Sequence, residues 1–367
     1  MTKVQETTLE VNLSALAHNL NFLRSKINAT TKLLAVVKAY AYGSDAQQVA
    51  LRLQELNVDY FAVAYTDEGI ALRKVGVTKP ILVLHPLPIH FNEIISYCLE
   101  PSLYSFAVLK AFLKASENEK DYPVHLKFNT GLNRLGFNSE DVVEIQTTIK
   151  NKANVKIASL FSHLGASEDL LEKDFTLQQI EDFKQLSTQL VSGLDYKPMF
   201  HILNTSGILN YAEIGQFDMV RSGIGLYGFG NDPKFSKNLK PVVALKSIIS
   251  QIHDIKPNES IGYNKGHIAK TAMRTATIPL GHADGITRIY GKGKGFLTVN
   301  GKKCAIVGNV CMDMLMIDIT GVDCKEGDEV LVFGENPTAS EFAATAGTIS
   351  YELITAISQR IRRKVVS

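Results

Sequence analysis

Short apolar runs alternate with amphipathic segments up to about residue 240 of the 367-residue chain. The first amphipathic segment is typical: between Leu13 and Ile27 an apolar residue recurs every three or four positions, which gives a helix one apolar face. The apolar runs number eight and span 33–37, 60–64, 81–84, 102–104, 124–128, 157–162, 199–203 and 217–220. Runs that are apolar throughout are typical of parallel strands buried on both faces. Eight strand–helix units predict a (β/α)8 TIM barrel over residues 1–240, with 102–104 as its least convincing strand.

The pattern changes after Pro241. Segments 242–255, 271–279, 295–299 and 304–319 read as β structure, and 339–346 and 349–361 as short helices. Asn300-Gly301 is a strong hairpin signal, because both residues tolerate the positive φ of a two-residue turn. We therefore expect an α/β protein in which a C-terminal, mainly antiparallel β domain over residues 241–367 follows the barrel.

Composition narrows the classes of function. A formal net charge of +2 gives no reason to expect nucleic acid or an anionic membrane as a partner. No apolar run approaches the ~18 residues of a transmembrane helix, and the N-terminal MTKVQETTLE lacks the apolar core of a signal peptide. The four cysteines are widely spaced and form no CxxC pair, so neither a metal site nor a disulfide framework is expected. These features predict a cytoplasmic protein.

Polar and ionisable residues follow the apolar runs, at the end of the strands where a TIM barrel carries its chemistry. Lys38 is the most informative, because it follows the apolar run LLAVV. Burial lowers the pKa of a lysine from ~10.4 and makes its amine nucleophilic, so such a residue can form a Schiff base with an aldehyde cofactor. The other strand-end residues are His85, Asn129, Thr130, His163, Asn204, Thr205 and Arg221. Their convergence on one rim favours an enzyme that acts on a small molecule.

The segment VVKAYAYG around Lys38 resembles the pyridoxal-phosphate signature of the alanine racemase family, with Tyr40 where the family usually has Asn or Asp. Other segments resemble family motifs in the family's order along nearly the whole chain: HLKFNTGLNRLGF, FSHLGASED, HILNTSG, RSGIGLYG, IGYNKG, GHADGITR, GNVCMDMLMIDIT and TISYE. On these motifs the chain is identified as a member of that family. The resemblance implies a pyridoxal 5'-phosphate enzyme that interconverts L- and D-alanine, supplies D-alanine for peptidoglycan, and works as a homodimer with shared active sites.

The resemblance also implies individual roles. Lys38 would bind the cofactor and act as a base on one face of the substrate Cα, and Tyr263 of the partner subunit would act on the other face. His163 and Arg221 would form a relay, with Arg221 facing the pyridine nitrogen. Because a guanidinium keeps its proton, the ring would remain a weaker electron sink, which should suppress side reactions. Arg134 would contact the cofactor's phenolic oxygen and the substrate carboxylate.

Further roles follow from the same resemblance. Lys127 would be carbamylated to N6-carboxylysine, because a free ammonium beside Arg134 would be repelled. Met312 and Asp313 would reach the partner's site and bind substrate. The cofactor phosphate would be held by hydroxyls and backbone N–H groups in a set comprising Tyr42, Asn204, Thr205, Gly223, Ile224 and Tyr351.

The sequence departs from the family at two positions of the substrate entrance. His282 stands where the family has tyrosine and Asn309 where it has arginine, whereas Arg288 and Tyr351 are retained. These changes leave open a racemase with a broader or different range of amino acids.

Two further alternatives remain. One is a decarboxylase, because pyridoxal-phosphate decarboxylases share this two-domain architecture; Arg221 in place of a carboxylate and the Tyr263 motif disfavour it. The other is a catalytically silent pyridoxal-phosphate-binding protein. That reading is disfavoured because Lys38 and Tyr263 are both present.

Overall fold

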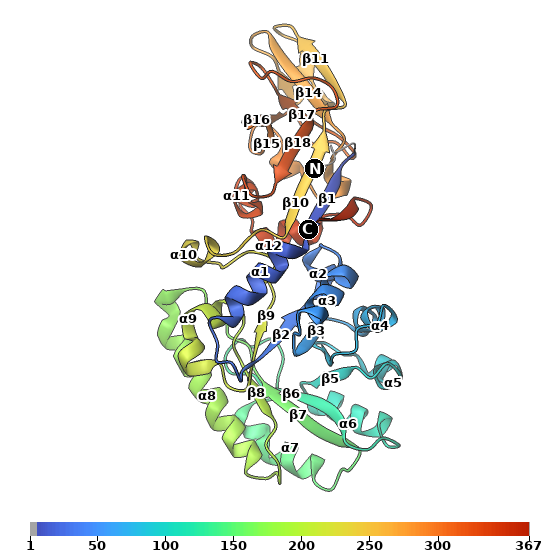
Figure 1. Ribbon diagram of the computed structural model, residues 1–367, viewed down its shortest axis with the longest axis vertical. Helices are drawn as coiled ribbons and strands as arrows, with labels where there is room; N and C mark the ends of the chain where they lie inside the picture. The colour runs from blue at the N-terminus through green and yellow to red at the C-terminus, as the bar shows by residue number, and fades with distance from the viewer. Residues whose placement is uncertain (1–5, 367) are drawn as a thin grey trace. The chain divides into compact units, whose positions relative to one another are not determined.

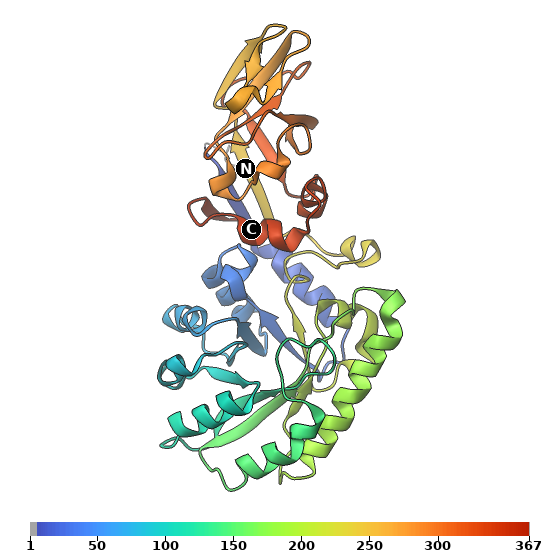
Figure 2. The ribbon, with the colours of Figure 1, turned by 180° about the vertical axis from the view of Figure 1, so that it is seen from behind.

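The computed structural model describes residues 6–366, which divide into two compact units (Figures 1 and 2). The barrel unit contains Leu16–Ala41 and Ala46–Lys240. The β unit contains the described residues up to Ala15, Tyr42–Asp45, and the described residues from Pro241 onward. No helix within residues 6–366 combines the length and the apolar composition needed to cross a bilayer.

The barrel unit is built on a sheet of parallel strands, eight within the described chain, in the order β8-β7-β6-β5-β4-β3-β2-β9. The strands are β2 (Lys32–Val36), β3 (Tyr60–Val63), β4 (Ile81–Val83), β5 (Glu100–Leu103), β6 (Tyr122–Lys127), β7 (Val155–Phe161), β8 (Met199–His201) and β9 (Met219–Ser222). The outermost strands, β8 and β9, are joined by backbone hydrogen bonds from Asp218 N to Phe200 O (3.2 Å) and from Arg221 N to Leu203 O (3.0 Å). The sheet is therefore a nearly closed barrel, and the predicted TIM barrel is confirmed.

Helices cover the outside of this barrel (Figures 1 and 2). In α3, for example, Val49, Ala50 and Leu53 are buried, so the helix packs one apolar side. The helices are α1 (Leu13–Arg24), α3 (Ala46–Glu55), α4 (Thr66–Lys74), α5 (Phe91–Ser96), α6 (Phe106–Ala115), α7 (Val142–Ile149), α8 (Lys173–Val191) and α9 (Thr205–Gly215). The short helix α10 (Pro233–Ser236) lies in the segment that follows β9. Single 3-10 turns lie at Pro88–His90, Ser139–Asp141 and Leu170–Glu172.

The β unit contains a mainly antiparallel sheet, nine-stranded in the part of the chain described, in the order β11-β14-β17-β16-β15-β18-β10-β1-β19. Its strands are β1 (Thr8–Asn12), β10 (Val243–Ile248), β11 (Gln251–Ile255), β14 (Met273–Ile278), β15 (Phe296–Val299), β16 (Lys302–Val307), β17 (Leu315–Asp318), β18 (Glu329–Phe333) and β19 (Arg362–Val366). The smaller elements are a hairpin of β12 (Ser260–Ile261) and β13 (His267–Ile268), the helices α11 (Ala339–Ala344) and α12 (Ser350–Ala356), and 3-10 turns at Tyr263–Lys265, His282–Asp284 and Arg288–Tyr290. The predicted hairpin turn is confirmed, since Asn300 and Gly301 link β15 to β16 with φ of 48° and 78°.

The structure differs from the sequence expectation at the N-terminus. The sequence placed residues 1–240 in the barrel, whereas β1 lies in the sheet of the β unit between β10 and β19. Thr8 pairs with Lys246 on one side and with Arg362 on the other. Both partner strands lie in the last third of the chain, so no local periodicity could indicate this pairing.

Candidate active site

Lys38 begins a left-handed turn directly after β2. Val37 is buried and donates its N–H to Ala62 O of β3 (2.9 Å), which anchors the strand end. The following segment, α2 (Lys38–Tyr42), has φ of 52° at Ala39 and 56° at Tyr40. A left-handed conformation costs roughly 1–2 kcal/mol per non-glycine residue. Such strain persists only where the surroundings hold the backbone in place, and it is common at functional sites.

Glu68 supplies part of that hold. It is the third residue of α4, and its carboxylate reaches back over the helix N-terminus. One oxygen accepts from Ala39 N (2.6 Å), and the other accepts from Ala64 N (2.7 Å) and Tyr65 N (3.1 Å). The carboxylate therefore ties the turn that carries Lys38 to the end of β3. Sequence reasoning missed Glu68, although an acidic residue at the third position of a helix is a known capping signal.

Cationic side chains converge with Lys38 on the rim of the barrel. Burial lowers the pKa of Lys38, and the charge of Arg134 lowers it further, while Glu68 opposes the effect. Burial together with the charges of Arg134, Arg221 and Lys38 lowers the pKa of Lys127 to about 8. These groups are close enough to repel one another, so this rim is suited to an anionic ligand.

Arg221 is held in a buried set of hydrogen bonds. Its Nη2 donates to Ser162 O (2.7 Å), Ile202 O (3.1 Å) and His163 Nδ1 (3.1 Å), and its Nη1 donates to His201 Nδ1 (2.7 Å). Burial lowers the pKa of Arg221 to about 9, which still leaves it cationic at neutral pH. A guanidinium only donates, so both imidazoles accept at Nδ1 and carry their proton on Nε2. Burial, and then the Arg221 charge, also holds the pKa of His163 and His201 well below the ordinary value.

The N-terminus of α9 meets the turn after β9. Thr205 Oγ1 lies 3.1 Å from Ser222 Oγ and accepts from Gly225 N (3.2 Å). Gly223 and Ile224, in the same turn, are buried. The first N–H groups of a helix lack intrahelical partners and attract anions, so this place is suited to a phosphate.

Asn204 has a different part in this arrangement. Its side chain caps α9 by accepting from Gly207 N (2.8 Å), and it also accepts from Ser167 Oγ (2.8 Å). The structure therefore places Asn204 where it orients the helix N-terminus.

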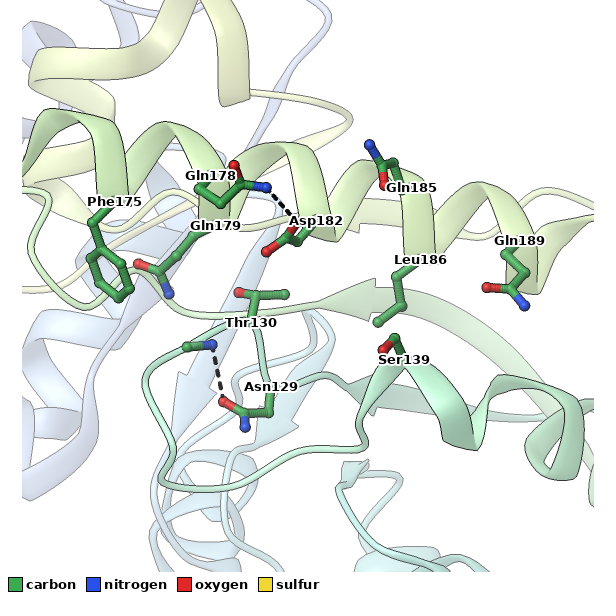
Figure 3. A pocket seen from close by; sticks show the side chains of 11 residues that line it. Asn129, Thr130, Ser139, Phe175, Gln178, Gln179, Asp182, Gln185, Leu186 and Gln189 are labelled. Carbon is green, nitrogen blue, oxygen red and sulfur yellow. Dashed lines mark hydrogen bonds between the residues drawn. The ribbon is translucent and has the colours of Figure 1, made fainter.

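Asn129 and Thr130 line a surface groove beside α8, with a volume of about 520 Å³ (Figure 3). Amide side chains dominate its wall, among them Gln178, which donates to Asp182 (2.7 Å). Among the described residues that line it there is no Lys, Arg or His. The groove is thus chemically unlike the cationic rim.

The β unit brings other predicted residues together. The rings of Tyr42 and Tyr351 lie 6.2 Å apart, centroid to centroid. Burial, and secondarily Tyr351, raises the pKa of Tyr42, so this phenol stays protonated and can donate a hydrogen bond.

Tyr263 is 73% exposed and lies in the turn between β12 and β13. Asn309 donates from Nδ2 to Tyr263 O (3.0 Å), so its side chain supports this turn.

Two loops of the β unit are joined by their backbones. His282 N donates to Cys311 O (2.9 Å) and Ala283 N to Met312 O (3.0 Å). A Cβ at Gly281 would collide with Met312 O, so this close approach requires glycine. Met312 itself is 59% exposed.

Arg360 fixes the acidic residues of the same loops. It donates to Asp313 Oδ1 (2.7 Å) and to Asp284 Oδ1 (2.6 Å), and Asp284 is buried. Sequence reasoning identified Asp313 but missed Asp284 and Arg360, which come from distant parts of the chain.

These features define a class. The chain is a barrel protein with a half-buried lysine of lowered pKa, near two arginines and a second lysine, at the carboxyl ends of the strands. Such an arrangement is suited to an enzyme that binds a small anionic ligand close to an amine.

Comparison with known proteins identifies the family. Models of the alanine racemase N-terminal and C-terminal domains match residues 11–231 and 242–365. The chain is 35% identical to the alanine racemase of Halothermothrix orenii, over 98% of this chain and 96% of that protein. Its structure matches that of the alanine racemase of Clostridium difficile 630 with a TM-score of 0.93 at 33% identity, covering 100% of this chain and 97% of that one. It also matches the alanine racemase of Bacillus anthracis with bound L-Ala-P, with a TM-score of 0.91 at 28% identity, covering 100% and 96%. The chain is an enzyme that belongs to the alanine racemase family.

Proposed function

We propose that the chain interconverts L- and D-alanine with pyridoxal 5'-phosphate as its cofactor, using Lys38 and Tyr263 of the partner subunit as opposed bases. The observation that carries the proposal is the half-buried Lys38 amine at the end of β2, whose pKa is lowered by desolvation and by Arg134. Lowering the pKa of Lys38 raises the fraction of its amine that is neutral, and the neutral amine is the form that binds an aldehyde and accepts a proton.

The chemistry of the donor set fits pyridoxal phosphate. The cofactor carries a phosphate and a phenolic oxygen, and the rim offers an excess of cationic side chains. Lys38 would hold the aldehyde carbon, Arg134 the phenolic oxygen, and Arg221 would face the ring nitrogen. The phosphate would be held by the α9 N-terminus with Thr205, by the backbone of Gly223 and Ile224, and by the hydroxyls of Tyr42 and Tyr351. His163 would support Arg221, and Asn204 would orient the helix.

When bound, the cofactor supplies the electron sink that makes the substrate Cα–H acidic enough to lose its proton. The Lys38 Nζ takes or returns that proton on one face, and the clamp by Glu68 keeps its backbone from moving. Arg221 retains its own proton at neutral pH, because its pKa is about 9. It can therefore offer a hydrogen bond but no proton to the ring nitrogen, which limits charge build-up there and disfavours side reactions.

Lys127 is proposed to be carbamylated. With its pKa lowered to about 8, a useful fraction of the amine is neutral near physiological pH. The neutral amine attacks CO2, an N–C bond forms and one proton is released, which leaves an anion in place of a cation. This change relieves the repulsion with Arg134. Intact mass spectrometry of protein kept in bicarbonate should show the addition of one CO2, which disappears in Lys127→Met.

A homodimer would supply the second base. Tyr263, Met312 and Met314 of the β unit are 73%, 59% and 51% exposed, so their side chains are available to a partner subunit. In the proposed dimer, Tyr263, Met312 and Asp313 complete the partner's site. We further propose that the reaction takes place in the cytoplasm and supplies D-alanine for peptidoglycan.

The second candidate is a racemase of broader specificity. It is favoured by His282 and Asn309, which replace a tyrosine and an arginine of the family pattern, and Asn309 supports the turn that carries Tyr263. The two candidates differ in which amino acid turns over fastest.

One assay tests both candidates. Interconversion of the D and L forms is followed for alanine, serine, lysine and arginine with the wild type and with Lys38→Ala. We expect the highest kcat/KM for alanine, and loss of activity and of cofactor absorbance in Lys38→Ala. Faster turnover of another amino acid would establish the second candidate. Full racemisation by Lys38→Ala without added amine would overturn the mechanism.

A further inference from the structure

A continuous chain of hydrogen bonds crosses the interior of the barrel below the rim. Arg221 Nη1 lies 2.7 Å from His201 Nδ1, and His201 Nε2 lies 2.8 Å from Ser159 Oγ. Ser159 Oγ lies 2.6 Å from His125 Nδ1, and His125 Nε2 lies 2.7 Å from Glu100 Oε2. These residues come from β9, β8, β7, β6 and β5, which form one side of the barrel (Figure 1).

The chain is isolated from solvent along its length. His125, Ser159 and His201 are 0% exposed, Arg221 is 4% exposed and Glu100 is 8% exposed. Burial of polar groups is costly unless each is hydrogen-bonded. Here the three inner side chains, His201, Ser159 and His125, each have a hydrogen-bond partner on both sides. The two ends of the series are a guanidinium and a carboxylate.

The chemistry of the two ends fixes the direction of every hydrogen. The Arg221 guanidinium can only donate, so His201 Nδ1 accepts and His201 Nε2–H donates to Ser159. The Ser159 hydroxyl then has its own hydrogen to give to His125 Nδ1. His125 Nε2–H in turn donates to the Glu100 carboxylate. All the hydrogens therefore point from the guanidinium toward the carboxylate.

Glu100 is anchored at the far end. It is the first residue of β5, away from the rim at which Arg221 acts. The Tyr60 side chain hydrogen-bonds with Glu100, and burial together with Glu100 raises the pKa of Tyr60. The phenol thus keeps its proton and donates it, so the carboxylate accepts from both Tyr60 and His125.

A series of this kind changes the hydrogen bond at the end opposite the carboxylate, which here is the bond between His201 and Arg221. A carboxylate that accepts from an imidazole makes the opposite ring nitrogen a better acceptor, as in the carboxylate–histidine–metal arrangement. Aligned hydrogen bonds also polarise one another in a low-dielectric interior. The effect here is to strengthen the bond from His201 to Arg221 and to hold the guanidinium in one orientation.

We infer that Glu100, His125 and Ser159 are positioning residues of the reaction, which hold Arg221 toward the cofactor ring by acting through His201. This inference rests on the proposed function, because Arg221 has this task only if the ring nitrogen lies before it. A merely structural role would make each side chain stabilise the fold independently of the others.

The test compares Glu100→Gln, Ser159→Ala, the double variant and Ser102→Ala. Glu100→Gln keeps an acceptor for His125 but removes the charge. Ser102 is a matched control: it lies on β5, is 0% exposed, and its hydroxyl has no hydrogen-bond partner in the described part of the chain. Both Ser159→Ala and Ser102→Ala therefore delete a serine hydroxyl from the barrel interior. Ser159 belongs to the hydrogen-bonded series and Ser102 does not.

Two readouts are taken on the holoenzyme. The first is kcat and KM for alanine racemisation. The second is the 15N–1H spectrum of protein labelled at its nine histidines, assigned with His125→Gln and His201→Gln. The Nε2–H signal of His201 reports the strength of its hydrogen bond without depending on turnover.

We expect kcat to fall about five-fold in Ser159→Ala, the factor that corresponds to one hydrogen bond, with KM nearly unchanged. Glu100→Gln should lower kcat by a smaller factor and should shift the His201 Nε2–H signal. In the double variant Glu100→Gln should add nothing to Ser159→Ala, because the series is already interrupted. Ser102→Ala should leave kcat and the His201 signal unchanged.

Multiplying effects of Glu100→Gln and Ser159→Ala would overturn the inference, as would an unchanged His201 signal in Glu100→Gln. Equal losses of kcat in Ser159→Ala and Ser102→Ala would also overturn it. The spectra separate this failure from failure of the proposed function: a wild type without racemase activity refutes the function, whatever the histidine signals show.

Discussion

Lys127 offers a quantitative test of the electrostatics at the rim. In the cofactor-free protein and without CO2, its ammonium is buried near Arg134, Arg221 and Lys38, and its pKa falls from 10.5 to about 8. Because one pKa unit corresponds to about 1.4 kcal/mol, the protonated side chain destabilises the folded state by roughly 3 kcal/mol. The ammonium also lies 5.9 Å from the centroid of the Phe161 ring, a contact that contributes only about 0.5–1 kcal/mol. Lys127→Met should therefore stabilise the fold, by about 2 kcal/mol at pH 6.

The pH dependence has a definite sign. Below pH 8 the lysine is protonated in both the folded and the unfolded state, and the full penalty is present. Between pH 8 and 10.5 the folded state releases the proton while the unfolded state keeps it, so the stability of the wild type rises relative to the variant. The advantage of Lys127→Met should accordingly shrink across this range.

Urea unfolding followed by circular dichroism measures the effect, since the chain has no tryptophan to serve as a fluorescent probe. Lys110→Met is the control: Lys110 is exposed and also lies over a phenylalanine ring, that of Phe106 (5.3 Å). It should change stability by less than about 0.5 kcal/mol. A Lys127→Met variant that is less stable at pH 6, or whose advantage does not vary with pH, would refute the reasoning.

Substitutions at three other residues test the supports of the site. Glu68→Ala should lower the free energy of unfolding by about 1 kcal/mol, because three backbone N–H groups near the surface lose a charged acceptor, and it should lower kcat. Glu68→Gln should have intermediate stability and kcat, and equal kcat in the wild type and both variants would contradict the clamp. Gly281→Ala should lower thermal stability and racemase activity together, since its Cβ collides with Met312 O; a variant with the wild-type melting temperature would argue against that close approach. Arg360→Ala should raise KM for alanine several-fold more than it lowers kcat, because Asp313 loses its partner, and steady-state kinetics that show only a kcat change would count against this role.

The barrel could be predicted because its strands are buried on both faces and are therefore apolar throughout. The least convincing run, at 102–104, corresponds to β5, whose sequence is EPSL. Glu100 and Ser102 are buried within the barrel, so the strand is polar where a strand pattern should be apolar. The polar residues of β5 made this strand hard to recognise in the sequence, and one of them, Glu100, is the carboxylate at the end of the hydrogen-bonded series.

The site was only partly visible in the sequence. Strand ends indicated Lys38, His163 and Arg221, because each directly follows or ends an apolar run. The left-handed turn at Lys38 and its clamp by Glu68 depend on the neighbouring strand, which no local pattern reveals. The same holds for Arg360, whose partners lie in other loops.

The proposal that Lys38 and Tyr263 act on one substrate from different subunits is tested most directly by mixing two inactive variants. Lys38→Ala and Tyr263→Phe are each expected to lack racemase activity, and each is unfolded and refolded alone and as an equal mixture. In a mixed dimer with shared sites, one site contains both mutations and the other contains neither.

Random pairing makes half of the dimers mixed, so the mixture should recover about one quarter of the wild-type alanine racemisation. Sedimentation of the refolded material checks that dimers have formed. A mixture of dimers with no activity above its parents would show that the two bases do not meet across subunits. Activity in either variant alone would contradict the assignment of that residue as an essential base.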